Sequence, residues 1–426
     1  MLKSNKKTSK IYLDCASSAL STSSNPGAIH ELGVKEKNKL ENARTTIANI
    51  LNAHNNEIIF TSGATESNNL AILGLAYPYI ISPYGRERKK EGVMPHIVTT
   101  NIEHASVLEV CKHLEKTKQA EVTFVEVEES GIVNPEKIKK SLKKNTVLVS
   151  VMYVNNEIGA IQPIREIAKE IRHWNKNRKK VFEKTFPVPV FFHTDATQAV
   201  NYLPVSIPQL GVDMMSFNSA KIYGPKGVGV LYVKKNTPIS PIMFGGDQEF
   251  GLRPGTENVV LAVGLAKALE ITEKIKDKEV KRLTKLRDYF IDKILKIKND
   301  TNSAMAKSVS DLGIILNGNK KNRLPNNINI TIPNIPSDLL VIELSAKGIM
   351  TSSKSACKAG DGKASHVIKA IRPKAKPDRN ASHSDAGRET DGSLRFSLGR
   401  YTTKSDIDYT IKSLSEILTK LKKWYN

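Results

Sequence analysis

One lysine of this sequence follows an apolar run and directly precedes a glycine-rich turn. The run 211–217, Gly-Val-Asp-Met-Met-Ser-Phe, is typical of a short buried strand, and Lys221 lies just beyond it. Gly224, Pro225 and Gly227 disfavour the continuation of a helix or strand. We therefore predict that Lys221 is half shielded from water, where desolvation lowers an amine's pKa and makes it nucleophilic toward an aldehyde. This position alone does not establish such a role, because most lysines beside a turn are solvated surface groups.

A possible phosphate site lies further upstream. The segment 61–66, Thr-Ser-Gly-Ala-Thr-Glu, separates a predicted strand at 57–60 from a predicted helix at 67–76. Free backbone N–H groups and the helix dipole favour an anion at such a turn. Many helices begin this way without a ligand, so this turn alone is a weak signal.

Strand-like and helix-like segments alternate through the middle of the chain. The expected strands are 96–100, 122–127, 146–153, 188–193 and 211–217, and the expected helices are 105–116, 135–143 and 164–175. This order predicts β-α-β units and a mostly parallel sheet, which binds ligands at the carboxyl ends of its strands. Polar residues follow those ends at His104, at 155–157, at Asp195 with Gln198, and at Lys221. We expect them to meet at one edge.

The pattern changes after residue 256. The expected elements there are a helix at 258–298, a strand at 327–332, a helix at 338–347, a strand at 392–397 and a helix at 404–424. They predict a second, smaller α+β domain. We divide the chain into an N-terminal arm (1–22) that packs with the small domain, a large domain (23–262) and a small domain (263–426).

The composition is that of a globular protein. The 426 residues are 39% hydrophobic and 25% charged, as in soluble enzymes. The longest apolar stretch, 70–81, is too short to cross a bilayer, and the basic start lacks the apolar core of a secretory signal. We therefore predict a cytoplasmic protein without a membrane segment.

The cysteines and the net charge exclude further classes. Cys15, Cys111 and Cys357 are too few and too scattered for a disulfide framework or a metal site. The net charge of +22 is spread over helical faces and loops with no basic stripe interleaved with aromatics. We do not expect direct nucleic-acid binding.

Together the polar clusters match the needs of one cofactor, pyridoxal 5'-phosphate. Lys221 would bind its aldehyde, the turn at 63–65 its phosphate, and Asp195 its ring nitrogen, while His104 could stack on the ring and exchange protons. Each residue has a simpler interpretation, as a helix cap or a turn former. Because all of these residues occur together and in this order, the cofactor interpretation is favoured.

Seven motifs resemble the NifS/IscS cysteine desulfurases. They are Thr-Ser-Gly-Ala-Thr-Glu (61–66), Asn-Asn-Glu-Ile-Gly (155–159), Thr-Asp-Ala-Thr-Gln (194–198), Lys-Ile-Tyr-Gly-Pro-Lys-Gly (221–227), Arg-Pro-Gly-Thr-Glu-Asn (253–258), Ser-Ala-Cys (355–357) and Arg-Phe-Ser-Leu-Gly-Arg (395–400). The resemblance runs from about residue 12 to residue 409. It implies the α/β fold of pyridoxal-phosphate enzymes of fold type I, with a mostly parallel seven-stranded sheet, and a homodimer whose sites lie at the subunit interface.

The resemblance also implies roles for single residues. These are Lys221 for the Schiff base, Asp195 for the pyridine nitrogen, Asn156 and Gln198 for the ring and its phenolic oxygen, Ala64, Thr65 and Asn218 for the phosphate, Thr256 for the phosphate of the other subunit, His104 for stacking and proton transfer, Arg395 with Asn156 for the substrate, and Cys357 as the sulfur acceptor. The family has serine at position 218 and histidine at position 220, where this chain has Asn218 and Ala220.

The implied reaction converts L-cysteine to L-alanine and leaves a persulfide on Cys357. The polar and cationic neighbours of Cys357 favour a reactive thiolate, whereas Cys15 and Cys111 are interpreted as structural. The long connection from Cys357 to Arg395 resembles the group that passes sulfur directly to iron-sulfur scaffolds and tRNA-thiolating enzymes. Two alternatives remain open: a selenocysteine lyase or other β-eliminating lyase, and a non-catalytic sulfur carrier or nucleic-acid-binding relative.

Overall fold

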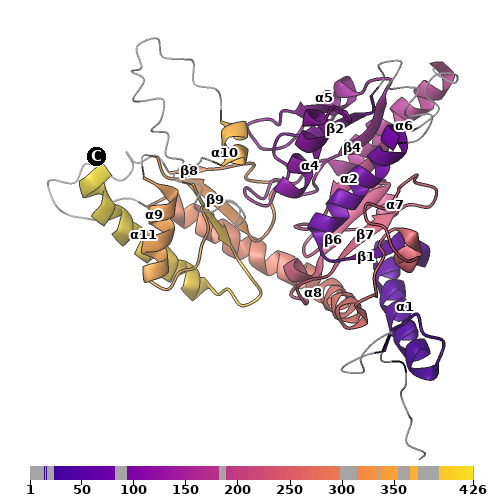
Figure 1. Ribbon diagram of the computed structural model, residues 1–426. Helices are drawn as coiled ribbons and strands as arrows, with labels where there is room; N and C mark the ends of the chain where they lie inside the picture. The colour runs from indigo at the N-terminus through magenta and orange to yellow at the C-terminus, as the bar shows by residue number, and fades with distance from the viewer. Residues whose placement is uncertain are drawn as a thin grey trace, which may run out of the picture.

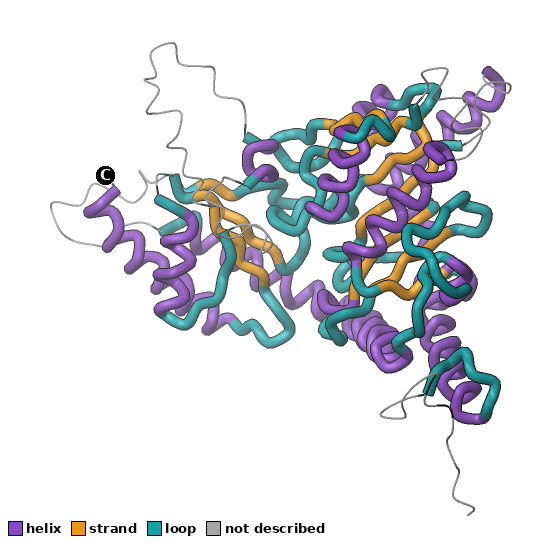
Figure 2. Tube along the Cα trace, viewed as in Figure 1, coloured by secondary structure: helices purple, strands orange, loops and turns teal. Residues whose placement is uncertain are grey.

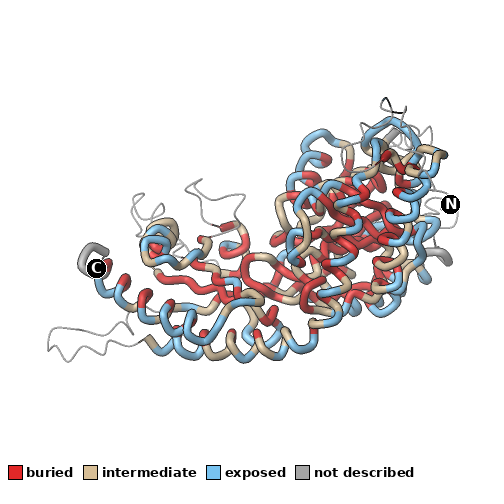
Figure 3. The backbone as a smooth tube through the Cα atoms, turned by 90° about the horizontal axis from the view of Figure 1, so that it is seen from below, coloured by how far each residue is buried: buried red, intermediate tan, exposed pale blue. Residues whose placement is uncertain are grey.

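Two separate β-sheets organise the chain. The computed structural model describes residues 14, 16, 24–81, 94–181, 189–297, 314–333, 335–353, 365–372 and 393–425. Within them, a seven-stranded sheet lies in one lobe and a three-stranded sheet in the other (Figures 1 and 2). Figure 3 shows that buried backbone fills the interior of both lobes and continues between them.

The large sheet has the strand order β1-β7-β6-β5-β4-β2-β3. Its strands are β1 (Ile58–Thr61), β2 (His96–Thr100), β3 (Glu121–Val125), β4 (Thr146–Ser150), β5 (Phe191–Asp195), β6 (Met214–Asn218) and β7 (Gly229–Val233). The pairs β2–β3, β2–β4, β4–β5 and β5–β6 are parallel, and only β7 runs against its two neighbours. The predicted mostly parallel sheet is therefore confirmed.

Both faces of this sheet are covered by helices. Successive strand residues alternate between two cores; Ile97, for example, packs on one side and Val98 on the other. On the first side lie α2 (Ala64–Ile81) and α4 (Ala105–Lys116). On the second lie α1 (Glu31–Leu51), α5 (Pro135–Ser141), α6 (Ile164–Val181) and α7 (Ile207–Leu210). Strands buried on both faces have no room for solvated polar side chains, so these collect beyond the strand ends.

A long helix, α8 (Val259–Ile294), joins the two lobes (Figure 1). It packs against α1 and a short 3-10 helix, η2 (Ser219–Ile222), near the large sheet, and against β9 and α11 in the other lobe. The smaller sheet has the order β10-β9-β8, with β8 (Ile315–Leu316), β9 (Asn327–Thr331) and β10 (Ser393–Ser397) all antiparallel. Helices α9 (Ser337–Ala346), α10 (His366–Ile371) and α11 (Lys404–Tyr425) complete this lobe. Two further 3-10 helices are η1 (Asn55–Glu57) and η3 (Gln248–Gly251).

Most of the expected elements are present within a few residues of their predicted bounds, and three differences are informative. Helix α2 begins at Ala64 rather than at residue 67 and continues through Pro78 to Ile81. Strand β7 and helix α10 were not predicted. The predicted N-terminal arm (1–22) lies almost entirely outside the described residues. The domain boundaries stay a prediction; the one at 262/263 falls in the first turn of α8.

No helix in the described ranges is both long enough and apolar enough to cross a membrane.

A histidine in the centre of the large sheet generates a stability prediction. The ring of His193 is buried between the hydroxyls of Ser150 and Ser216, each 2.9 Å from a ring nitrogen. Burial lowers the pKa of His193 to about 4, so between pH 6.5 and pH 4 the unfolded chain binds a proton that the folded chain excludes. We expect the free energy of unfolding to fall as the pH drops through this window, with about 2 kcal/mol of the loss between pH 7 and pH 5 due to this ring.

Urea titrations at pH 7 and pH 5 on the wild type and on His193→Asn check this. The variant is expected to be less stable at pH 7 and to lose less stability than the wild type on acidification. Equal losses in the two proteins would contradict the assignment.

Candidate functional site

A cavity of about 450 Å³ opens at the carboxyl edge of the large sheet. Side chains at or after the ends of five of its strands, β1, β2, β4, β5 and β6, line this cavity, together with residues of β10 from the other sheet. Its polar lining comprises Thr65, His104, Ser106, Asn156, Asp195, Thr197, Gln198, Asn201, Tyr202, Asn218, Lys221, Tyr223, Asn326, Arg395 and Ser397. All but two of the eleven residues assigned from the sequence lie here. The exceptions are Thr256 and Cys357.

The turn between β1 and α2 forms one wall of the cavity. Gly63 has a φ of 156°, which residues with a side chain rarely adopt, and Ala64 and Thr65 begin the 18-residue helix α2. No described residue accepts a hydrogen bond from the backbone N–H of Ala64 or Thr65, as expected for the first turn of a helix. Gly229 of β7 lets the turn approach, because a Cβ there would lie 2.7 Å from Gly63 backbone atoms. The two free donors and the helix dipole suit a phosphate.

Lys221 also lines the cavity, and its predicted shielding is wrong. It lies within η2 rather than directly on the end of β6, and it is exposed. The 3-10 turn carries it past the strand end into the wall of an open cavity, which explains the exposure. The Asn218 Oδ1 atom accepts a hydrogen bond from the Lys221 backbone N–H at 3.2 Å and so fixes this turn. Asn218 Nδ2 has no acceptor among the described residues and is available to a ligand. Ala220 also lines the cavity.

Asp195 and His104 both hold backbone N–H groups while facing the cavity. Asp195 Oδ1 accepts from Thr197 N at 2.9 Å. His104 is the N-cap of α4, with its Nδ1 atom accepting from Ser106 N at 3.2 Å. The simpler interpretation as a helix cap is therefore correct for His104, whereas Asp195 holds a turn and caps no helix. Neither bond excludes a ligand. A single side chain, Asn68, donates to Asp195 and to Ser106.

Arg395 reaches the cavity from the smaller sheet. Its Nη1 donates to the Asn156 backbone oxygen at 3.0 Å, while its Nε is buried with no acceptor in the described part of the chain. Burial lowers the pKa of this guanidinium, which Glu157 opposes. A partly buried guanidinium with a spare N–H can bind a carboxylate.

Cys357 lies outside the described residues, but the residues that flank its segment are anchored beside the cavity. On one side, Ser352 pairs with Arg395 through two backbone hydrogen bonds. On the other, Ser365 Oγ donates to Glu157 Oε2 at 2.5 Å, and His366 Nε2 lies 3.1 Å from the Glu103 backbone oxygen. Both ends of the segment that contains Cys357 are thus held at the cavity wall. Cys111 is buried, and burial raises its pKa to about 12, which agrees with a structural role.

Thr256 is exposed and does not line the cavity. It follows η3, where Glu249 and Phe250 adopt left-handed backbone with φ of 47° and 58°. Such backbone is strained in non-glycine residues. A bidentate ion pair holds it in place: Arg44 Nη1 and Nη2 each lie 2.8 Å from a Glu249 carboxylate oxygen, and both side chains are buried. The Phe60 N–H also donates to this carboxylate.

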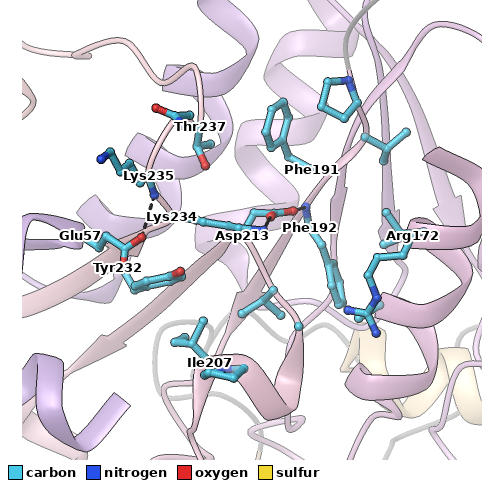
Figure 4. Close-up of a pocket in the computed structure, with 18 of the residues that line it drawn as sticks. Glu57, Arg172, Phe191, Phe192, Ile207, Asp213, Tyr232, Lys234, Lys235 and Thr237 are labelled. Carbon is cyan, nitrogen blue, oxygen red and sulfur yellow. Dashed lines mark hydrogen bonds and ion pairs between the residues drawn. The ribbon is translucent and has the colours of Figure 1, made fainter. Parts of the chain in front are cut away.

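A larger cavity, of about 570 Å³, lies at the opposite edge of the sheet (Figure 4). Its two acidic side chains already have partners: Asp213 pairs with Lys234 at 3.1 Å, and Glu57 accepts from the Lys235 backbone N–H at 2.8 Å. Its floor includes Phe191 and other apolar side chains. Size alone therefore does not make it the reactive site.

Sequence reasoning missed several residues of the first cavity. Asn68, Ser106 and Thr197 carry polar atoms at or directly behind its lining. Ser106 could have been found, because it lies two positions after His104, at the spacing of a side-chain cap. Asn68 has no comparable signal, because it is one of two adjacent asparagines near the start of a helix.

Comparisons with known proteins agree with this geometry. The family model Aminotransferase class-V matches residues 6–410. The chain belongs to this family. It is 41% identical to a protein of Dictyoglomus turgidum named cysteine desulfurase IscS, over 93% of this chain and 88% of that one.

Two solved structures resemble this class-V aminotransferase over most of their length. One, named NifS-like protein, has a TM-score of 0.74 and 33% identity and covers 93% of this chain and 92% of its own. The other is described as SspA in complex with cysteine, with a TM-score of 0.64 and 30% identity over 89% and 92%. The expected family and fold are confirmed.

The buried pair Arg44–Glu249 generates a prediction about the segment that carries Thr256. We expect Arg44→Met to lower the free energy of unfolding by about 3 to 5 kcal/mol, because it leaves a buried carboxylate without its cation. We expect Arg44→Met/Glu249→Leu to be less destabilised than the sum of the two single changes. A double-mutant cycle from urea denaturation measures this coupling. Additive losses would mean that the pair does not hold the segment.

Proposed function

We propose that this member of the class-V aminotransferase family is a cysteine desulfurase that uses pyridoxal 5'-phosphate. The observation that carries the proposal is the cavity itself, where Lys221, Asp195 and the free N–H groups of α2 surround one space that Arg395 also enters. The volume of about 450 Å³ is in the range of small-molecule and cofactor sites. The relative from Dictyoglomus turgidum, named cysteine desulfurase, supports the same activity.

The donors and acceptors of the cavity fit this cofactor. The Ala64 and Thr65 N–H groups, with the spare amide of Asn218, would hold its phosphate. Asp195 would accept a hydrogen bond from the ring nitrogen, and Gln198 would contact the phenolic oxygen. When bound, the cofactor supplies an electron-withdrawing ring that stabilises negative charge on the substrate carbon next to its amine.

The substrate would be oriented by residues from both sheets. Arg395 would bind the carboxylate of L-cysteine through its guanidinium, held in place by its hydrogen bond to Asn156. Lys221 would provide the amine that exchanges with the substrate amine, and His104 would lie over the ring. These groups would hold the amine and the carboxylate of L-cysteine and leave its side chain free to react.

Cys357 would remove the sulfur. The carbon–sulfur bond of L-cysteine breaks and a sulfur–sulfur bond forms with Cys357. Of the two thiol hydrogens, one ends on the methyl group of alanine and one remains with the persulfide. The anchoring of residues 352 and 365 beside the cavity supports this transfer. We propose an iron-sulfur scaffold or a tRNA-thiolating enzyme as the next sulfur acceptor, in the cytoplasm.

A homodimer is part of the proposal. Exposed apolar side chains, Met243, Phe244 and Phe250, lie in the same segment as Thr256, and Phe244 is 85% exposed. Burial of this segment against a second copy would remove that apolar surface from water. It would also bring Thr256 to the phosphate of the partner's cofactor.

Replacement of the lysine tests cofactor binding. Lys221→Ala is expected to abolish the visible absorbance of the Schiff base in protein saturated with pyridoxal phosphate, because no other amine lines the cavity among the described residues. Lys226→Ala, in the same turn, is the matched control and should keep the band. Borohydride reduction followed by peptide mass analysis should find the cofactor on Lys221. A band that survives in Lys221→Ala would refute the assignment.

Replacement of the cysteine tests sulfur transfer and separates the proposal from a lyase. Cys357→Ser is expected to reduce alanine formation from L-cysteine by at least about 100-fold, because the sulfur then has no nucleophile to accept it. Persulfide labelling with an alkylating probe should also disappear. Cys15→Ser is the control. A Cys357→Ser variant that still releases sulfide or selenide at the wild-type rate would indicate a β-eliminating lyase instead.

A further inference from the structure

A chain of hydrogen bonds joins two titratable side chains of the cavity, Asp195 and His104. Asn68, fully buried in α2, donates from Nδ2 to Asp195 Oδ2 and to Ser106 Oγ, both at 2.8 Å. Ser106 Oγ in turn lies 2.9 Å from His104 Nδ1. Neither Asn68 nor Ser106 has a role in the function proposed above.

The chemistry of the partners fixes the direction of each bond. A carboxylate oxygen only accepts, so the nitrogen of the Asn68 amide must face Asp195. The same nitrogen donates its second hydrogen to Ser106 Oγ, which leaves the serine hydrogen free for His104 Nδ1. The Ser106 backbone N–H, which can only donate, also points at Nδ1. Nδ1 therefore accepts twice and carries no proton.

We propose that Asn68 and Ser106 are positioning residues that lock neutral His104 in the tautomer with its proton on Nε2. The ring then offers an N–H donor, rather than a lone pair, to whatever lies beside it in the cavity. A second proton on Nδ1 would require both the cap of α4 and the serine bond to break. The effect on catalysis that we infer rests on the proposed function. The tautomer of His104 rests only on the hydrogen bonds around its ring.

The unpaired oxygen of Asn68 supports a role beyond packing. Asn68 Oδ1 is buried and has no donor among the described residues. A buried acceptor without a partner costs roughly 1 to 3 kcal/mol. An apolar residue of similar size would avoid that cost, so it is the two donors of the amide that explain an asparagine here.

The first measurement is made on the wild-type protein, and a substitution serves only to assign its signals. In the full chain labelled with ¹⁵N-histidine, long-range ¹H–¹⁵N spectra at pH 8 distinguish the two tautomers, and His104→Gln identifies the signals among the nine histidines. We expect a protonated Nε2 and an unprotonated Nδ1 for His104, with and without pyridoxal phosphate. A protonated Nδ1 would overturn the proposal. This measurement does not depend on whether the protein releases sulfur from cysteine. A wrong tautomer and a wrong proposed function can therefore be told apart.

Two substitutions test the bonds. Ser106→Ala removes the hydroxyl donor, so the His104 Nδ1 signal should move away from its hydrogen-bonded position, and Ser106→Thr should restore it. In loaded enzyme we expect Ser106→Ala to lower kcat by roughly 3- to 10-fold, the effect of one hydrogen bond, with cofactor Kd changed less than about twofold. Asn68→Ala, which also removes a donor to Asp195, should weaken cofactor binding by a similar 3- to 10-fold. An unchanged Nδ1 signal in Ser106→Ala would overturn the positioning role.

Discussion

Hydrogen bonds from the backbone to side chains at or just beyond the strand ends are the interaction on which the cavity depends. His104, Asp195 and Asn218 each accept from a backbone N–H two or three positions further along the chain. The strands before them are buried on both faces, and a polar side chain inside them, such as His193, is bonded to neighbouring side chains rather than to solvent. The sheet therefore gathers its polar side chains at one edge, and the local bonds hold each of them in one orientation.

The second requirement is that the two lobes keep a fixed relation, because Arg395 comes from the smaller sheet. Several contacts join the lobes near the cavity. The Arg400 guanidinium stacks on Tyr223 at 4.1 Å, and the Arg400 N–H donates to the Tyr223 hydroxyl. Arg282 of α8 donates to the backbone oxygens of Gly399 and Thr402. The residues directly after β10 thus contact both α8 and the turn that follows Lys221. These contacts fix the position of Arg395 relative to Lys221.

The sequence predicted this edge well because the rule behind it is topological. Parallel strands end on the same side, so polar residues after successive strands must meet, whatever the details of packing. The prediction failed where a local sequence pattern is compatible with more than one backbone conformation. The shielding of Lys221 was wrong because an apolar run ending near residue 217 does not reveal the 3-10 turn that follows it. Strand β7 was missed because it follows that glycine-rich turn directly and reverses the direction of the sheet.

Long-range pairings were the least accessible from the sequence. Asn68 and Asp195 are 127 positions apart, and Arg44 and Glu249 are 205 apart. No periodicity links such residues, and a buried asparagine or arginine looks like a surface residue until its partner is known. The left-handed backbone at Glu249 and Phe250 was equally hidden, because neither residue is glycine. The Glu249 carboxylate is held there by the distant Arg44 and by the Phe60 N–H.

Capping and chemistry are not competing explanations for a polar residue at a strand end. Asp195, His104 and Asn218 each have two polar side-chain atoms, and the backbone bond engages only one of them. For His104 the bond also determines the other atom, since an acceptor at Nδ1 leaves the proton on Nε2. Serine and threonine can cap a helix equally well, but each has only one polar side-chain atom. A ligand would have no second polar atom to bind. A residue type with a second polar atom at a cap position is therefore more informative about function than the cap itself.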